Sequence, residues 1–242
     1  MPSPSQIDRL EGLAGHMLDS YLALRERSAV LEPLLFDQSV IDCYGSGRRH
    51  RGFHALRTSL FMSCVQDIAK LVSDKDQKAP SFRNFIAELT SDSLVIQLRS
   101  RYAKRVTPLA NEETDPEILT ALKQLDAQAE EERRIEFDQH LHTLRKWWDA
   151  NETGKVVQAC RVIRDKVTAH TEIKFVIDKY VTVDVAALDL KWSDVKRFSK
   201  EMQEPVASIG LLIRCAGFAW EMLDRQLAIA TKEFWRTEEA NA

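Results

Sequence analysis

An arginine, an aspartate and a histidine within one seven-residue stretch could together cleave RNA without a metal ion. The stretch follows an apolar-periodic segment, 156–163, that predicts a helix, and it reads RDKVTAH. Arg164 carries a permanent charge on a planar fork that matches phosphate oxygens. His170 can accept and donate a proton near neutral pH. Asp165, directly after the arginine, can orient either of the other two side chains.

The same pattern, an arginine and a histidine with four to six residues between them, also occurs at two other places. These are Arg48 or Arg49 before His54, and Arg133 or Arg134 before His140. Short patterns match by chance, but only Arg164 is followed by a carboxylate. Glycines within 44–52 predict a loop, and the charge run 130–134 is typical of a solvated helix face. The alternative for Arg164 and His170 is a surface arginine plus a histidine favoured by a helix C-terminus.

Composition predicts one globular domain over residues 1–242, with a helical extension within 107–150 as an option. The chain has 242 residues and a hydrophobic share of 44%. Lys and Arg number 34 against 37 Asp and Glu, so the formal net charge is −3. This balance excludes a bulk polyanion binder, and any contact with nucleic acid must use a local basic patch.

The cysteines and the apolar runs predict a soluble, cytoplasmic protein with no membrane partner. Cys43, Cys64, Cys160 and Cys215 include no close pair, which argues against a zinc ribbon, a redox pair or a disulfide framework. We expect reduced thiols, partly buried. The first residues lack the pattern of a signal peptide, and the most apolar run, 206–220, is too short to span a bilayer.

Helical periodicity dominates the chain and predicts an all-α, up-and-down bundle. The expected helical segments begin with one capped by Ser5, and the others are 34–43, 53–72, 81–89, 91–105, 115–148, 155–170, 193–203 and 205–236. Asp115-Pro116 is a clear start signal, and Ser193 is the expected cap of its helix. A phase shift across 130–136 predicts that this part projects into solvent or kinks. Strand-like residues within 172–190 predict a long loop or a small hairpin.

The segment 163–172 resembles the HEPN superfamily (higher eukaryotes and prokaryotes nucleotide-binding). The signature of that superfamily is Arg, then Asn, Asp or His, then a few residues and His, and the segment reads IRDKVTAHTE. It particularly resembles the AbiU-like abortive-infection branch. In that branch the motif typically begins with Arg-Asn-Lys or Arg-Asp-Lys and ends with Ala-His. The earlier segment 54–74 also resembles that branch, so the resemblance covers residues 10–230 in outline.

The resemblance implies metal-independent RNA cleavage at the interface of a two-fold dimer, with no cofactor. His170 would act as general base or acid on the ribose 2′-hydroxyl, Arg164 would hold the scissile phosphate, and Asp165 would orient one of them. Arg164 and His170 are about 9 Å apart along a regular helix and on different faces. A dimer would double these groups and build a cleft. RNA, a second copy, and an antitoxin or other defence-system protein are the implied partners.

Two other functions stay open beside the nuclease. Many members of the superfamily are non-catalytic modules that bind RNA or a protein partner. A bundle that binds a small molecule would need a closed apolar pocket with few polar groups. Some family toxins carry a tyrosine two residues after the histidine, where a partner enzyme modifies them. Glu172 stands there in this chain, so we do not expect that control.

A local basic patch with an interleaved aromatic ring lies around Phe53. It could bind RNA phosphates and stack against a base, and a solvated loop without a ligand explains the same residues equally well. The predicted RNA-binding residues are Arg48, Arg49, Arg51, His54, Arg57, Arg161 and Lys166. Asp138 and His142 share one helix face, but two ligands alone make a poor metal site. We therefore predict no metal ion.

Overall fold

The computed structural model describes residues 4–104, 115–168, 173–176, 179–182 and 184–235. Its elements are α1 (Pro4–Phe36), α2 (Gln38–Tyr44), η1 (Gly47–Arg49), α3 (His50–Ser73), α4 (Phe82–Glu88), α5 (Asp92–Ala103), α6 (Pro116–Asn151), α7 (Lys155–Ile163), η3 (Arg164–Thr168), β1 (Ile173–Val176), β2 (Lys179–Thr182), η4 (Ala186–Leu188), α8 (Trp192–Glu201), α9 (Gln203–Arg214) and α10 (Trp220–Phe234).

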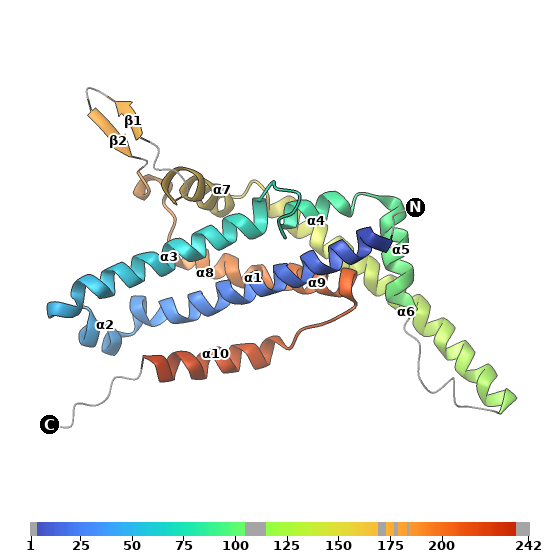
Figure 1. Ribbon diagram of the computed structural model, residues 1–242. Coiled ribbons are helices and arrows are strands. Elements are labelled where there is room, and N and C mark those ends of the chain that lie inside the picture. Colours follow the sequence, from blue (N-terminus) through green and yellow to red (C-terminus); the bar gives the residue numbers. More distant parts are fainter. Residues whose placement is uncertain (1–3, 105–114, 169–172, 177–178, 183, 236–242) are drawn as a thin grey trace.

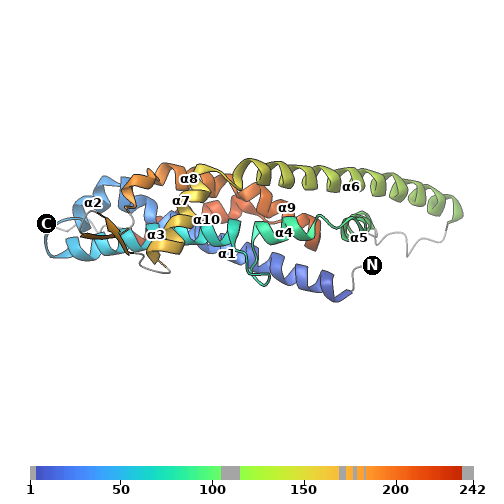
Figure 2. The same ribbon diagram turned by 90° about the horizontal axis from the view of Figure 1, so that it is seen from above.

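The helices form an elongated bundle, which confirms the all-α prediction. The long helices α1 and α3 pack against each other, and α8 and α9 lie along the same core (Figure 1). Viewed from above, the first half of α6 extends well beyond the rest of the molecule (Figure 2). No helix in the described ranges is long and apolar enough to cross a membrane.

The strand-like segment within 172–190 forms a two-stranded antiparallel hairpin that stands away from the bundle (Figure 1). Ile173 pairs with Thr182, and Val176 pairs with Lys179. The β-branched and aromatic residues of β1 and β2 favour this extended conformation. Of the two options that the sequence left open here, the hairpin is confirmed.

Helix starts with strong local signals lie where the sequence predicts them. The Asp115 carboxylate accepts the backbone N–H of Glu117 at 2.9 Å, and Pro116 is the first residue of α6. The Ser81 hydroxyl accepts the N–H of Asn84 at 3.3 Å at the start of α4. Local hydrogen bonds decide these starts, which is why they can be predicted from a few residues.

Two predicted helix caps are wrong. Ser5 lies inside α1, which begins at Pro4, because proline suits the first helical turn, where its missing N–H is not needed. Ser193 lies inside α8, which begins at Trp192. There the Asp194 carboxylate accepts the backbone N–H of Lys191 at 3.2 Å, so the helix starts one turn before that carboxylate.

The predicted glycine-arginine loop 44–52 is shorter in the structure. Gly47 has a φ of +62°, a conformation that suits glycine, and it turns the chain from α2 into η1. Helix α3 already begins at His50, so its first turns carry residues that we expected in a loop. Leu56 has the spacing of a core residue of α3 but is 40% exposed, whereas Phe53, one turn earlier, is 6% exposed and belongs to the core.

The predicted final helix, 205–236, is two helices. Cys215 adopts a left-handed conformation with φ of 51°, and its N–H donates to the carbonyl of Leu211 at 3.0 Å. This bond from the left-handed residue back to Leu211 is that of an αL-type helix end, and the next N–H, of Ala216, donates to the carbonyl of Gly210 at 3.3 Å. The chain then returns along α1 as α10, and Ala216, in the connection between the two helices, is exposed.

Helix α6 is continuous through 130–136, so of the two options that the sequence leaves open here the kink is wrong and the projection into solvent is confirmed. The phase shift marks the place where the helix leaves the core. Phe137 is fully buried, whereas Ile118, Leu125 and Ile135 are 46%, 60% and 50% exposed. The first half of α6 therefore projects from the bundle (Figure 2).

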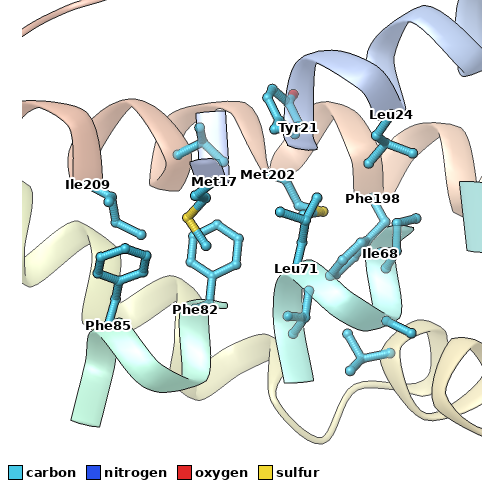
Figure 3. Packing of buried hydrophobic residues seen from close by; sticks show 14 of the residues in the cluster. Met17, Tyr21, Leu24, Ile68, Leu71, Phe82, Phe85, Phe198, Met202 and Ile209 are labelled. Carbon is cyan, nitrogen blue, oxygen red and sulfur yellow. The ribbon is translucent and has the colours of Figure 1, made fainter. Parts of the chain in front are cut away.

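The part of the core labelled in Figure 3 lies between α1, α3, α4, α8 and α9, and buried residues of α5, α6 and α7 extend it. Its largest side chains interdigitate in the close-up, and Figure 3 labels Met17, Tyr21, Leu24, Ile68, Leu71, Phe82, Phe85, Phe198, Met202 and Ile209. Burial raises the pKa of the Tyr21 hydroxyl, which donates to the carbonyl of Ser199 at 2.9 Å. This hydrogen bond gives the Tyr21 hydroxyl, the polar group among the labelled core residues, a partner and links α1 to α8.

The four thiols should divide into two reactive and two protected ones. Burial raises the pKa of Cys64 to about 11 and that of Cys160 to about 12, whereas Cys43 is half-buried and Cys215 exposed. The thiolate is the reactive form, so a disulfide reagent at pH 8 should quickly modify Cys43 and Cys215 only. All four should react after denaturation. Rapid reaction of all four in the folded protein would contradict the burial of Cys64 and Cys160.

Candidate functional site

Helix α7 places Arg164 at the end of a well-packed segment. Val157, Cys160 and Ile163 are fully buried and hold α7 against α3 (Figure 1). Gly154 precedes the helix, and Arg164 follows directly after its last residue. Because three buried residues on one face anchor the helix, the position of the Arg164 backbone is set by the core.

A π-helical turn, η3, continues the chain from Arg164 to Thr168. In a π turn each hydrogen bond spans five residues, so the turn is wider than in an α-helix, and such turns are frequent at functional sites. The sequence predicted a regular helix up to His170. The angle between Arg164 and His170 that follows from regular α-helical geometry therefore does not apply here.

Two carboxylates flank the Arg164 guanidinium. Its Nε donates to Oδ1 of Asp165 at 2.7 Å, and its Nη1 lies 3.9 Å from Oδ2 of Asp74. The Arg164 side chain is 22% exposed. Asp165 comes from the same turn, whereas Asp74 follows the last residue of α3. The arrangement holds the guanidinium at the junction of α3 and α7, with part of the side chain at the surface.

His170 and Glu172 lie outside the described residues, and the role of His170 stays a prediction. Arg161 and Lys166 are half-buried cations on either side of Arg164 in the sequence. Arg161 precedes Arg164 by three residues, which places both on one face of the helix. The structure therefore brings Arg161, Arg164, Asp165 and Lys166 into one short segment.

The basic patch predicted to bind RNA lies elsewhere. Arg48 and Arg49 are in η1, and Arg51, His54 and Arg57 are in the first turns of α3. From Arg57 to the end of α3 at Ser73 is about 24 Å at 1.5 Å per residue. Because Arg164 contacts the residue after Ser73, this patch and Arg164 are at opposite ends of α3.

Asp74 is the neighbour of Arg164 that sequence reasoning missed. It lies far from Arg164 in the chain, and its only local signal is its place after the end of a predicted helix. The packing of α7 on α3 brings the two residues together. No pattern of spacing within one segment could have found this contact.

The segment of α6 that contains Arg134 and His140, the other arginine and histidine pair on a predicted helix, is a solvated helix face, as expected. Arg134 pairs with Glu130 and Glu131, and His140 lies 3.7 Å from Glu136. Asp138, considered as a metal ligand, instead accepts a hydrogen bond from Arg99 at 2.6 Å. Among the described residues, no group of three His, Cys, Asp or Glu is placed to hold a metal ion.

A groove of about 690 Å³ lies between α1, α8 and α10, and Arg164 is not part of it. Its lining mixes apolar residues with charged ones, including Arg25, Glu32, Lys196 and Asp224. Arg25 pairs with Asp224 and Lys196 pairs with Glu32 across it. This lining differs from the closed apolar pocket that a bundle binding a small molecule would need.

A family model of the HEPN type, described as AbiU2, matches residues 7–234. The match includes the RDKVTAH stretch, both ends of α3 and the projecting half of α6. No curated protein and no solved structure matches the chain.

Proposed function

The chain belongs to the AbiU2 family of HEPN domains, and on this premise we propose that it is a metal-independent endoribonuclease. We place its site at the interface of a homodimer and assign it a role as a toxin or phage-defence component in abortive infection. Its substrate is RNA, and an antitoxin or another defence-system protein is its partner. The observation that carries the proposal is the Arg164 side chain, held by Asp165 on a π turn beside α3.

Each residue of the motif has one task in the proposed reaction. His170 takes the proton of a ribose 2′-hydroxyl, and the 2′-oxygen attacks the adjacent phosphorus. The bond to the 5′-oxygen breaks, and that oxygen leaves with a proton, so the products end in a 2′,3′-cyclic phosphate and a 5′-hydroxyl. Arg164 binds the phosphate and stabilises the charge of the transition state, and Asp165 orients Arg164.

His170 follows the π turn closely in the sequence, two residues after Thr168. Arg161, Arg164 and Lys166 come from the same short stretch of the chain. The proposal therefore assigns the histidine and Arg164 joint action on one phosphate.

Charge supports a site that is shared between two copies. The two carboxylates of Asp74 and Asp165 pair with Arg164 and offset part of the charge that Arg161, Arg164 and Lys166 carry, so one protomer offers little net positive charge to a polyanion. A two-fold axis near η3 would bring a second set of these cations and a second His170 to the same cleft. A dimer therefore offers a stronger phosphate site than one protomer.

The alternative is a non-catalytic module that binds RNA or a protein partner. The ion pairs of Arg164 favour it, because structural ion pairs also gather charged residues at the ends of helices. In that case Arg164 and His170 would contribute to stability or binding, and replacing them would change no cleavage rate.

Cleavage of total cellular RNA by the purified protein in EDTA tests the proposal. We expect defined fragments that end in 2′,3′-cyclic phosphate and 5′-hydroxyl groups, because the histidine and the arginine need no metal. Light scattering establishes the dimer in the same buffer. A folded dimer that leaves RNA intact, or cleavage that EDTA abolishes, would overturn the proposed nuclease. Intact RNA that is nevertheless bound would favour the module.

A further inference from the structure

One end of the bundle carries arginines in a stretch without any carboxylate. Between Asp42 and Asp67 the chain has no acidic residue. The stretch covers the end of α2, all of η1 and the first two-thirds of α3, at the left of Figure 1. We call Arg48, Arg49, Arg51 and Arg57 the arginine cluster. Such a stretch is unusual here because acidic residues outnumber basic ones over the whole chain.

The arginine cluster differs from many other arginines of the described ranges in its contacts. Many of those are paired with carboxylates, as in Arg9–Glu88, Arg27–Asp67 and Arg99–Asp138. Within the described ranges, no residue of the arginine cluster forms an ion pair with a carboxylate. Its positive charge is therefore not neutralised by direct pairing and can attract a polyanion.

Aromatic rings, instead of carboxylates, position two of these guanidinium groups. Arg49 lies over the Tyr44 ring at 5.6 Å, and Arg57 lies over the Phe53 ring at 5.7 Å. Nη2 of Arg57 also lies 2.9 Å from Nδ1 of His54. A ring holds a guanidinium by its face and leaves its charge available for phosphate oxygens.

Two exposed histidine rings complete the surface. The rings of His50 and His54 pack edge to face at 4.3 Å. Desolvation, and then the charges of Arg57 and His50, lower the pKa of His54, so its ring is neutral at pH 7 and can accept the hydrogen bond of Arg57. Arginines with exposed flat rings suit single-stranded RNA, whose bases offer π faces for stacking.

From this geometry we propose that the arginine cluster is a second RNA-binding surface, separate from Arg164, that selects RNA chains long enough to reach both. This inference rests on the proposed function. The two places are about 24 Å apart along α3. At one phosphate per about 3.4 Å of stacked strand, this distance spans about seven nucleotides. The preferred substrate is an RNA with a single-stranded segment of at least that length.

Cleavage of a long and a short RNA tests the selection by length. The substrates are an unstructured 20-nucleotide RNA and a four-nucleotide RNA. The variant Arg48→Gln/Arg51→Gln is compared with Lys123→Gln/Lys200→Gln, which removes the same charge from exposed positions of α6 and α8. We expect kcat/KM of the first variant to fall about tenfold for the long RNA and to stay unchanged for the short one, since each lost phosphate contact weakens binding. The control should match the wild type on both.

Binding of a 20-nucleotide 2′-O-methyl RNA keeps this inference separate from the nuclease. This RNA lacks the attacking hydroxyl, so its affinity, measured by fluorescence anisotropy, does not depend on cleavage. Loss of two phosphate contacts should reduce the slope of log affinity against log salt by about 1.4. An unchanged slope would overturn the RNA-binding surface. An equal loss of cleavage for both RNA lengths would place the cluster at the cleavage site and overturn its separate role.

Discussion

Replacing His170 with alanine should lower the rate of RNA cleavage by about 10²–10⁴-fold, because the 2′-hydroxyl then loses the group that takes its proton. The rate is measured under single-turnover conditions with the 20-nucleotide RNA in EDTA, so that product release does not enter. RNA affinity, measured with the 2′-O-methyl RNA, should change little. A large loss of rate with retained affinity is the signature of a general base or acid.

A matched control separates this role from damage to the fold. His142→Ala removes a histidine from an exposed position of α6 and should leave the rate unchanged. Thermal unfolding of both variants shows whether the bundle is intact. A His170→Ala protein that folds, binds RNA and cleaves at the wild-type rate would show that His170 is not the proton acceptor.

Mixing two inactive variants tests whether the site is shared between protomers. In a shared site, a dimer of one Arg164→Ala protomer and one His170→Ala protomer keeps one intact combination of Arg164 and His170. Part of the activity should then return when the two proteins are co-refolded. If each protomer held its own site, every site in the mixture would lack one residue, and no activity would return.

Replacing Arg164 with lysine should lower the cleavage rate by about 10²–10³-fold, although the positive charge is kept. A lysine ammonium is a point charge, whereas the arginine fork can bind two phosphate oxygens and keep its Nε bond to Asp165 at the same time. The loss should be larger in the single-turnover rate than in RNA affinity, because the fork acts mainly on the transition state.

Arg161→Lys is the control for this change, because Arg161 lies one turn earlier on the same helix. A phosphate contact by Arg161 tolerates lysine, so its rate should stay within a few fold of the wild type. The ion pairs of Arg164 are partly exposed, and losing them should cost about 1 kcal/mol or less in the free energy of unfolding. Equal rates for the Arg164 and Arg161 variants would contradict a special role for Arg164.

Local chemistry explains why much of the fold is predictable from sequence. Ser81 and Asp115 start their helices through hydrogen bonds to backbone groups two or three residues away, so a few residues decide the outcome. The same is true of the glycine at position 47, whose positive φ ends the connection before α3. The all-α class follows from apolar periodicity, which is likewise a property of short windows.

Contacts between residues that are distant in the sequence explain why some sequence-based predictions of the fold are wrong. The segment 205–236 has the periodicity of one helix, yet α9 ends at a left-handed Cys215 so that α10 can return along α1. There the ring of Trp220 packs edge to face against Tyr21 at 5.6 Å. Leu56 has the right spacing to face the core but is 40% exposed, whereas Phe53 is buried at that end of α3, so the neighbours in space and not the spacing alone decide which side chain is covered.

The sequence by itself determined which residues could do chemistry, because Arg164, Asp165 and His170 lie within one short stretch. It also offered Asp165 as a partner of either Arg164 or His170, and the structure shows the hydrogen bond to Arg164. Only the tertiary structure decided that Asp74 faces Arg164 and that the arginine cluster lies about 24 Å away along α3. Spacing in the chain describes one face of one element, whereas the packing of α7 on α3 sets which distant charges meet.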